Sequence, residues 1–128
     1  LSWRTVVGEI KPVKRGDYVG YDCAERVMHS GTIAVLPVGY WDGYDRHLSN
    51  KGSVLIHGKM CSVVGNICMN MSMVDVTDVP KSRAGDEVIL LGTQGAHEIT
   101  AEELAAKIGT INYEVVTRIN PLIPRILV

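Results

Sequence analysis

Residues 33–50, IAVLPVGYWDGYDRHLSN, join a strand-like apolar run to a turn-rich segment that carries polar aromatic groups. The aliphatic residues between positions 33 and 38 are typical of a buried strand. Gly39 and Gly43 then allow backbone turns that bulky residues would resist. We expect the stretch either to present a site at the end of a strand or to form a solvated surface hairpin. The polar side chains that follow the strand are Tyr40, Asp42, Tyr44, Asp45, Arg46 and His47.

On both sides of this stretch, the chain consists mostly of short β-like runs separated by turn residues. Turn clusters stand at residues 14–17 (KRGD) and 50–52 (NKG), and residues 57–58 (HG) have the composition of a hairpin turn. About seven or eight short strands predict an antiparallel barrel or sandwich, and we favour the barrel, because a parallel sheet would need more helices. The strands are expected at residues 1–13, 18–21, 33–38, 53–57, 59–64, 71–77, 87–91 and 125–128.

Only late in the chain does the pattern change to that of a helix. Thr100 stands at a helix N-cap position, and Glu103 follows three residues later, as in a capping box. The helix is expected over residues 101–108 and should end at Gly109. Thr110 is expected to cap a second short helix. The fold class is therefore predicted to be mainly β, with one or two short helices late in a single domain.

The composition excludes several classes of protein. The hydrophobic fraction of 46% and the charged fraction of 21% are those of a globular protein, and no apolar run approaches the ~20 residues needed to cross a bilayer. Thirteen basic and fourteen acidic residues leave a net charge of −1. Because such a chain has no basic footprint, we expect neither nucleic acid nor a membrane surface as its partner.

The cysteines indicate the cellular location of the protein, and the first residues indicate that the sequence is a fragment. Cys23, Cys61 and Cys68 cannot all pair within one chain, and their spacing fits neither a zinc motif nor a redox pair. We therefore expect a reducing, cytoplasmic location. The sequence begins with LSWRT and without a signal pattern, so we expect it to be part of something longer.

Spacing alone assigns no chemistry to these residues. The four histidines lie far apart in the sequence, so no metal site is expected, and neither a phosphate loop nor a nucleophile elbow is present. Tyr21, Tyr40 and Tyr113 lie at the expected edges of strands and helices, yet a tyrosine is more often a half-buried ring than a catalyst. Cys68 and Met69 suit core packing by soft sulfur side chains. Composition and spacing therefore predict a mainly β domain and assign no function to it.

In its motifs the sequence resembles the C-terminal domain of alanine racemase, the pyridoxal-phosphate enzyme that interconverts L- and D-alanine. The resemblance runs over essentially the whole chain and rests on the order of the motifs. It implies a longer enzyme, whose N-terminal (β/α)8 barrel carries the lysine that forms the Schiff base with the cofactor. The motifs are GY at 20–21, LPVGYWDGY at 36–44, VGNICMN at 64–70, VDVT at 74–77, GDEV at 85–88, ITAEELA at 99–105 and GTINYE at 109–114.

The resemblance implies that Tyr21 is a catalytic base. Racemisation removes a proton from one face of Cα and delivers another to the opposite face, and in the family a tyrosine of this domain serves the neighbouring subunit of a homodimer. Because the pKa of a free tyrosine is about 10, a tyrosine base that works near neutral pH needs its phenolate form stabilised by roughly 4 kcal/mol. The nearby sequence offers only Arg26 as a cation, so we expect the isolated domain to be inactive.

The resemblance assigns further roles by motif. Met69 matches the residue whose backbone N–H binds the substrate carboxylate, and Tyr40 matches a tyrosine near the substrate pocket. Tyr113 matches a tyrosine whose hydroxyl reaches the cofactor phosphate from across the dimer. Arg46 and Ile111 resemble residues that line the access corridor. The cofactor implied is pyridoxal phosphate, and no metal is implied.

Three differences from the family keep alternatives open. Tyr21 lies between Gly20 and Asp22, where the family usually has Ser-Tyr-Gly. Asn70 stands where the family has Asp, and Asn66 stands where Arg is common. A serine or broad-specificity racemase is therefore an alternative, and so is a non-catalytic β-barrel module that serves dimerisation. The similar β domain of pyridoxal-dependent decarboxylases is disfavoured by the motifs at residues 68–69 and 111–114.

Overall fold

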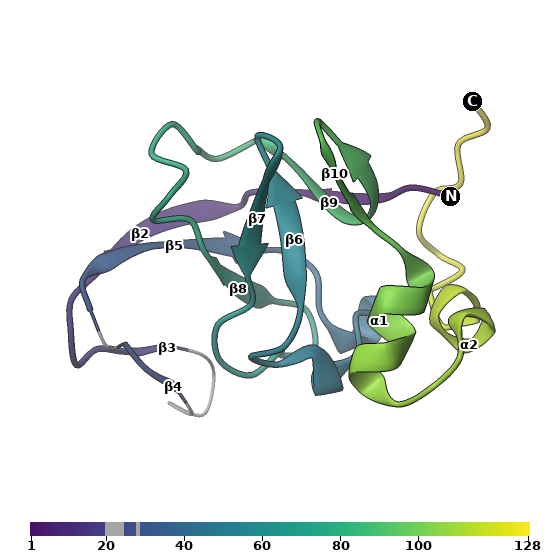
Figure 1. Ribbon diagram of the computed structural model, residues 1–128, viewed down its shortest axis with the longest axis horizontal. Coiled ribbons are helices and arrows are strands. Elements are labelled where there is room, and N and C mark those ends of the chain that lie inside the picture. The colour runs from purple at the N-terminus through teal and green to yellow at the C-terminus, as the bar shows by residue number, and fades with distance from the viewer. Residues whose placement is uncertain (20–24, 28) are drawn as a thin grey trace.

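The structure, a computed structural model, describes residues 1–19, 25–27 and 29–128. Ten strands, two 3-10 helices and two α-helices are found among these residues. Figure 1 shows the two α-helices side by side at one end of a body made of strands. The strands are β1 (Trp3–Val6), β2 (Glu9–Val13), β3 (Tyr18–Val19), β4 (Glu25–Arg26), β5 (Gly31–Leu36), β6 (Ser53–Ile56), β7 (Lys59–Ser62), β8 (Ser72–Asp75), β9 (Glu87–Gln94) and β10 (His97–Ile99). The helices are η1 (Tyr40–Asp42), η2 (Arg46–Leu48), α1 (Ala101–Ile108) and α2 (Asn112–Thr117).

The strand predicted at residues 33–38 is present as β5, the middle strand of an antiparallel sheet with the order β2-β5-β8. Ala34 lies opposite Ile10 of β2 and opposite Val74 of β8. Ala34 and Leu36 are completely buried, which explains the apolar composition of this run. The end of β5 is therefore fixed by a strand on either side.

The second sheet has the order β1-β9-β6-β7, and β10 also pairs with β9. The chain passes from β1 into β2 at Gly8, whose N–H donates to the Val35 carbonyl at 2.8 Å. An antiparallel bridge between Val63 and Val74 joins β7 to β8. Every strand pair described is antiparallel, so the prediction of a mainly β, antiparallel fold is confirmed.

The first α-helix forms where the capping box predicts it. The hydroxyl of Thr100 accepts a hydrogen bond from the N–H of Glu103 at 3.1 Å, and the Glu103 carboxylate accepts one from the N–H of Thr100 at 3.4 Å. Gly109 ends the helix with a left-handed φ of 76°. Leu104 and Ala105 are buried, so the helix is held by packing as well as by its cap.

Several local predictions were wrong. The strand expected over residues 1–13 is two strands, β1 and β2, which belong to different sheets, and the described residues form ten strands rather than the seven or eight expected. Residues 125–128 form no strand: they join no described strand in a ladder, and Leu127 and Val128 are exposed. Strand β9 does not end at Gly92 but continues to Gln94 and forms a hairpin with β10, and Gly92 has a φ of 127°, which glycine tolerates. The N-cap of α2 is Ile111 rather than Thr110, without a side-chain hydrogen bond.

Candidate functional site

The side chains beyond β5 are presented by the two short 3-10 helices, η1 and η2. The N–H of Gly39 donates to the Asp42 carboxylate at 3.0 Å, which closes the first turn. Gly43 then takes a left-handed φ of 102°. The turn leaves Tyr40 43% exposed and Trp41 60% exposed, directly at the end of the buried strand.

The segment that contains Met69 lies against this turn. The N–H of Tyr40 donates to the Cys68 carbonyl at 3.0 Å, and the N–H of Trp41 donates to the Met69 carbonyl at 2.9 Å. A Cβ atom at Gly39 would lie 2.1 Å from the Cys68 carbonyl oxygen, so only glycine permits this approach. Two motifs far apart in the sequence are therefore brought together at the level of their backbones.

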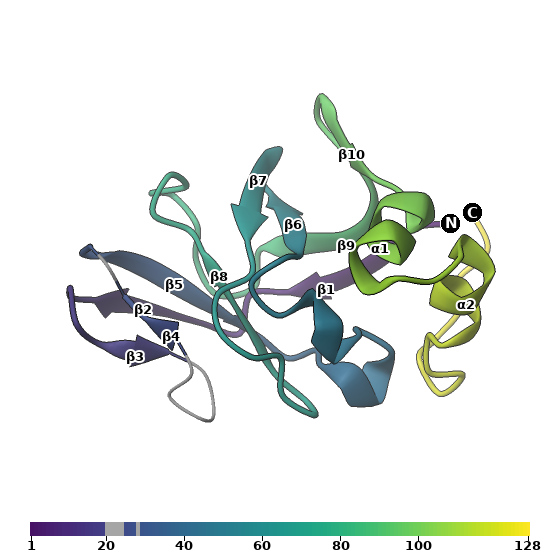
Figure 2. The ribbon, with the colours of Figure 1, turned by 60° about the horizontal axis from the view of Figure 1, so that its bottom comes forward.

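A second set of contacts fixes the loop at residues 65–68 to the end of the η2 turn. The N–H of Gly65 donates to the Asn50 side chain at 2.8 Å. The N–H of Ile67 donates to the Ser49 hydroxyl at 2.9 Å, and that hydroxyl donates to the Arg46 carbonyl at 2.5 Å. Figure 2 shows this loop beside η1 and η2. The backbone of Arg46 therefore belongs to the same rigid platform as Tyr40 and Met69, while the Arg46 side chain is exposed.

Helix α2 places the other predicted residues at its start. Ile111 is 60% exposed and Tyr113 is 71% exposed, so both side chains point away from the body. Just beyond the end of the same helix, the chain meets the Tyr40 turn, where the N–H of Asn120 donates to the Asp42 carbonyl at 3.0 Å. The side-chain amide of Asn120 also donates to the Trp41 carbonyl at 3.2 Å. Helix α2 is thus anchored at its end to the turn that carries Tyr40.

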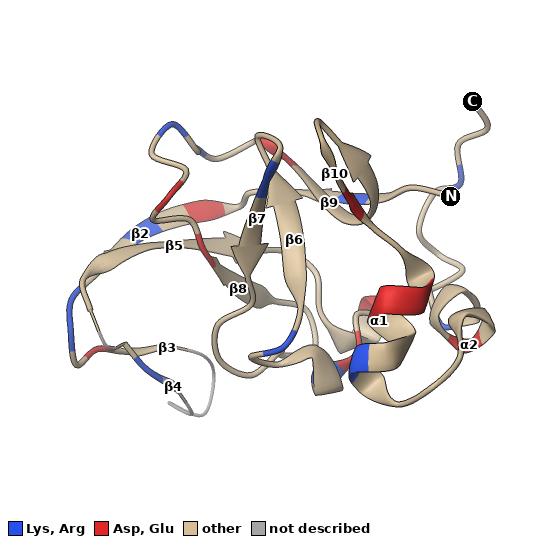
Figure 3. Cartoon of the chain, in the orientation of Figure 1, with Lys and Arg blue, Asp and Glu red and all other residues tan. Residues whose placement is uncertain are grey.

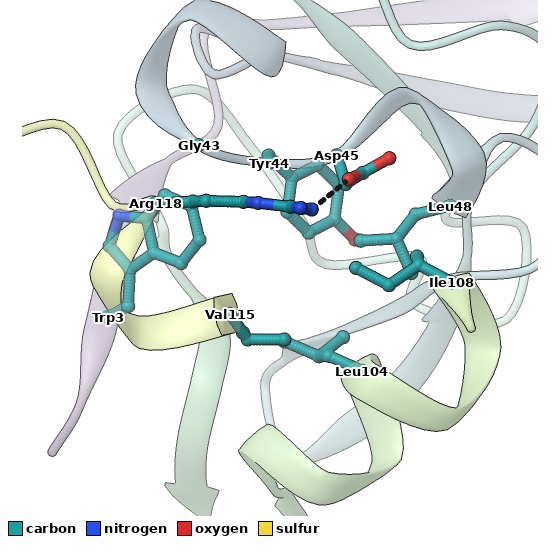
Figure 4. A pocket seen from close by; sticks show the side chains of 9 residues that line it. All are labelled: Trp3, Gly43, Tyr44, Asp45, Leu48, Leu104, Ile108, Val115 and Arg118. Atoms are coloured by element: carbon teal, nitrogen blue, oxygen red, sulfur yellow. Dashed lines mark hydrogen bonds and ion pairs between the residues drawn. The ribbon is translucent and has the colours of Figure 1, made fainter. Parts of the chain in front are cut away.

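An ion pair spans the gap between α2 and the same turn. Arg118 Nη1 lies 3.2 Å from Asp45 Oδ2, as Figure 4 shows, and its other terminal nitrogen meets the Glu114 carboxylate. The Asp45 Oδ1 atom accepts from the His47 N–H at 2.7 Å and lies 2.8 Å from the His47 ring. Burial opposes ionisation of Asp45, but the hydrogen bonds from His47 and the charges of His47 and Arg118 hold its pKa below the usual value.

Beneath this ion pair lies a small pocket between the 3-10 helices and the α-helices (Figure 4). Trp3 and Tyr44 meet edge to face there, with ring centroids 6.0 Å apart. The hydroxyl of Tyr44 has no hydrogen-bond partner among the described residues, and burial raises the pKa of Tyr44. A neutral, buried Tyr44 is therefore a packing residue. The pocket is lined by Trp3, Gly43, Tyr44, Asp45, Leu48, Leu104, Ile108, Val115 and Arg118.

The predicted base, Tyr21, lies outside the described residues. The flanking hairpin is described: Tyr18 pairs with Arg26 and Val19 with Glu25. A cavity of about 160 Å³ lies between this hairpin and strands β5 and β8, and its polar lining includes Arg26, His29 and Asp75. Figure 2 shows the hairpin at the opposite end of the molecule from α1 and α2.

Charges and possible metal ligands are dispersed. Figure 3 shows Lys and Arg interspersed with Asp and Glu along the ribbon. Within the described ranges, no group of three His, Cys, Asp or Glu residues is placed to hold a metal ion. In the part of the chain that the structure describes, no helix has the length and apolar character needed to span a membrane.

Sequence reasoning missed Trp41, Asn120 and Arg118. Trp41 follows Tyr40 directly, and a large exposed aromatic ring within a turn was the signal available for it. Asn120 carries no local signal, because its side chain contacts a residue 79 positions away. For Arg118, Glu114 four residues earlier was a local signal of an ion pair on a helix, but the pair with Asp45, 73 positions away, was not visible.

Comparisons with known proteins agree with the sequence motifs. The family described as "Alanine racemase, C-terminal domain" matches residues 1–127. The alanine racemase of Methylacidiphilum infernorum is 50% identical over 125 residues, which are 98% of this chain and 32% of that protein. The crystal structure of alanine racemase from Streptomyces lavendulae superimposes with a TM-score of 0.90 at 36% identity, over 98% of this chain and 32% of that one.

A third relative was solved with a cofactor. Alanine racemase from Bartonella henselae, with covalently bound pyridoxal phosphate, matches with a TM-score of 0.85 at 32% identity, over 93% of this chain and 32% of that one. The chain thus spans about a third of the length of these relatives. From the match over residues 1–127 and the shared fold, this chain belongs to the family of alanine racemase C-terminal domains.

Proposed function

We propose that the chain is the C-terminal part of an alanine racemase and forms one half of a composite active site. The observation that carries the proposal is the platform made by Tyr40 and Met69. Their backbones are joined by hydrogen bonds through residues 40–41 and 68–69, whereas their side chains remain 43% and 51% exposed. Rigid, exposed groups of this kind suit a pocket whose other wall lies outside these 128 residues.

In this proposal some residues of the chain bind and orient the amino acid, and one of them transfers a proton. Tyr21 exchanges the proton at one face of Cα, and the lysine of the absent (β/α)8 barrel serves the opposite face. The backbone of Met69 and the ring of Tyr40 hold the amino acid, while Arg46 and Ile111 line its path of entry. The matching site would stand in the neighbouring subunit of a homodimer.

Pyridoxal phosphate, when bound, would supply the electron sink that stabilises negative charge at Cα. Tyr113 fits contact with its phosphate, because the phenol hydroxyl is a hydrogen-bond donor and the side chain is 71% exposed. The Schiff-base lysine is not expected in this chain. Cys61 and Cys68 are free thiols, which supports a reducing, cytoplasmic setting.

We also propose that the antiparallel sheets close into the barrel predicted from the sequence. The continuous course of β1 into β2 joins the sheets on one side, and the bridge between Val63 and Val74 joins them on the other. In such a barrel the Tyr40 turn would lie at one rim, where loops commonly carry sites.

The test is racemisation by the full-length protein with L-alanine, D-alanine and L-serine as separate substrates. We expect turnover of alanine in both directions, and Tyr21→Phe should lose most of it while pyridoxal phosphate remains bound, as its absorbance would show. The 128-residue chain alone should be inactive and should form no Schiff-base absorbance. Preference for serine would favour the broad-specificity alternative. An inactive full-length protein would favour the dimerisation module, and normal turnover by Tyr21→Phe would exclude Tyr21 as the base.

A further inference from the structure

We propose that Arg118 is a positioning residue that sets the spacing between two parts of the site, the Tyr40 turn and the start of α2. The inference rests on the proposed function, because it concerns the residues assigned there. Asp45, one partner of Arg118, directly precedes Arg46, and Glu114, the other partner, directly follows Tyr113. The contact with Glu114 lies within helix α2, four residues apart, whereas the contact with Asp45 reaches across to η2. The guanidinium group therefore links the neighbour of Arg46 to the helix that carries Tyr113.

The geometry around Arg118 favours a fixed bridge over a loose surface contact. Its backbone lies close against Gly43, where a Cβ atom would come within 2.4 Å of the Arg118 carbonyl oxygen, and two residues later the N–H of Asn120 donates to the Asp42 carbonyl at 3.0 Å. The Asp45 side chain is 19% exposed, and its other oxygen is already held by the His47 N–H. A guanidinium offers several donors in a planar fork, which can serve two carboxylates at once.

The bridge has a direct consequence for the site. Arg46 is assigned to the access corridor and Tyr113 to the cofactor phosphate. The distance between these two residues should therefore affect the affinity for the amino acid and for the cofactor. Both Arg118 and Glu114 are about half exposed, with side-chain values of 50% and 48%. Because exposed ion pairs are weak, we expect an effect of about two- to fivefold on binding rather than loss of activity.

The experiment measures KM for L-alanine, kcat, and the half-saturating concentration of pyridoxal phosphate in the full-length enzyme. Arg118→Met removes the bridge, and Arg118→Lys keeps the charge without the fork. Asp45→Asn breaks the bridge from the other side, yet its amide oxygen can still accept from the His47 N–H and preserve the η2 turn. The matched control is Arg4→Met, which removes an exposed ion pair with Glu87 at 3.0 Å on strands β1 and β9.

We expect Arg118→Met and Asp45→Asn each to raise KM and the half-saturating cofactor concentration about two- to fivefold, with less change in kcat. The double variant should be no worse than the poorer single variant, and Arg118→Lys should fall between wild type and Arg118→Met. A purely structural role would instead lower the melting temperature and leave KM unchanged.

Kinetic constants that match those of Arg4→Met in both single variants would overturn the inference, and so would effects that multiply in the double variant. If Arg118→Met does not fold, Asp45→Asn decides the question. A wild-type enzyme without racemase activity would refute the proposed function and this role together, whereas an active wild type with unaffected variants would refute the role of Arg118 alone.

Discussion

At the scale of single residues, Gly39 determines whether the two main motifs can meet. Its φ of −152° is extended backbone that any residue can adopt, so the requirement for glycine is steric. A Cβ atom there would lie 2.1 Å from the carbonyl oxygen of Cys68 and 2.5 Å from that of Met69. Since both obstacles are backbone atoms, relief requires the Met69 segment to move away from Tyr40.

Gly39→Ala should therefore destabilise the fold and displace the Met69 segment from the Tyr40 turn. We expect a loss of about 3 kcal/mol in the free energy of unfolding, at the upper end of overpacking costs. Gly85→Ala is the control, because it places a methyl group in open space at a φ of 93° and should cost only about 1–2 kcal/mol. Urea denaturation measures both. Equal stability of Gly39→Ala and wild type would show that the close contact is absent.

The site was only partly predictable from single residues. Tyr40, Met69 and Tyr113 could be singled out because they stand in motifs that resemble a family. The hydrogen bonds that bring Tyr40 and Met69 together could not be foreseen, since they join backbone atoms of segments separated by nearly thirty residues. The side-chain pair between Arg118 and Asp45 could not be foreseen either, since the two residues are 73 positions apart.

At the scale of elements, signals within a few residues predicted structure well. The capping box of Thr100 and Glu103 placed α1 correctly, and the hairpin turn at residues 57–58 forms with both residues at positive φ. Two predictions for the end of the chain were wrong. Residues 125–128 have the composition of a strand but pair with no other strand, and α2 is tied to α1 by Asn112 and Glu102 rather than by a capping side chain.

The short helix η2 should respond to acid through its N-cap, Asp45. The pKa of Asp45 is lowered in the folded state, so its ionised form stabilises the fold above its unfolded pKa of about 3.9, and this stabilisation is lost as the pH falls through the folded value. Asp45→Asn should therefore be less stable than wild type at pH 7, with the difference shrinking below about pH 4. Urea denaturation across this range measures it, and a difference independent of pH would contradict the assignment.

At the scale of the whole molecule, the fold class followed from many short β runs separated by turns, and the antiparallel sheets agree with it. The chain presents exposed aromatic and apolar side chains at residues 40–41, 69, 111 and 113, all on segments fixed by hydrogen bonds or by helix α2. A surface that is both rigid and apolar is expected where another part of a protein completes a pocket. This supports the proposal of a site shared between subunits.

The most direct test of a shared site is complementation between two inactive full-length subunits, one with Tyr21→Phe and one lacking the cofactor lysine of its barrel. If Tyr21 serves the neighbouring subunit, a mixed dimer has one site with both defects and one intact site. Coexpression in equal amounts should then recover about a quarter of wild-type activity, because half of the dimers are mixed and each has one working site of two. If Tyr21 instead serves its own subunit, every site carries one defect, and the mixture would show no recovery.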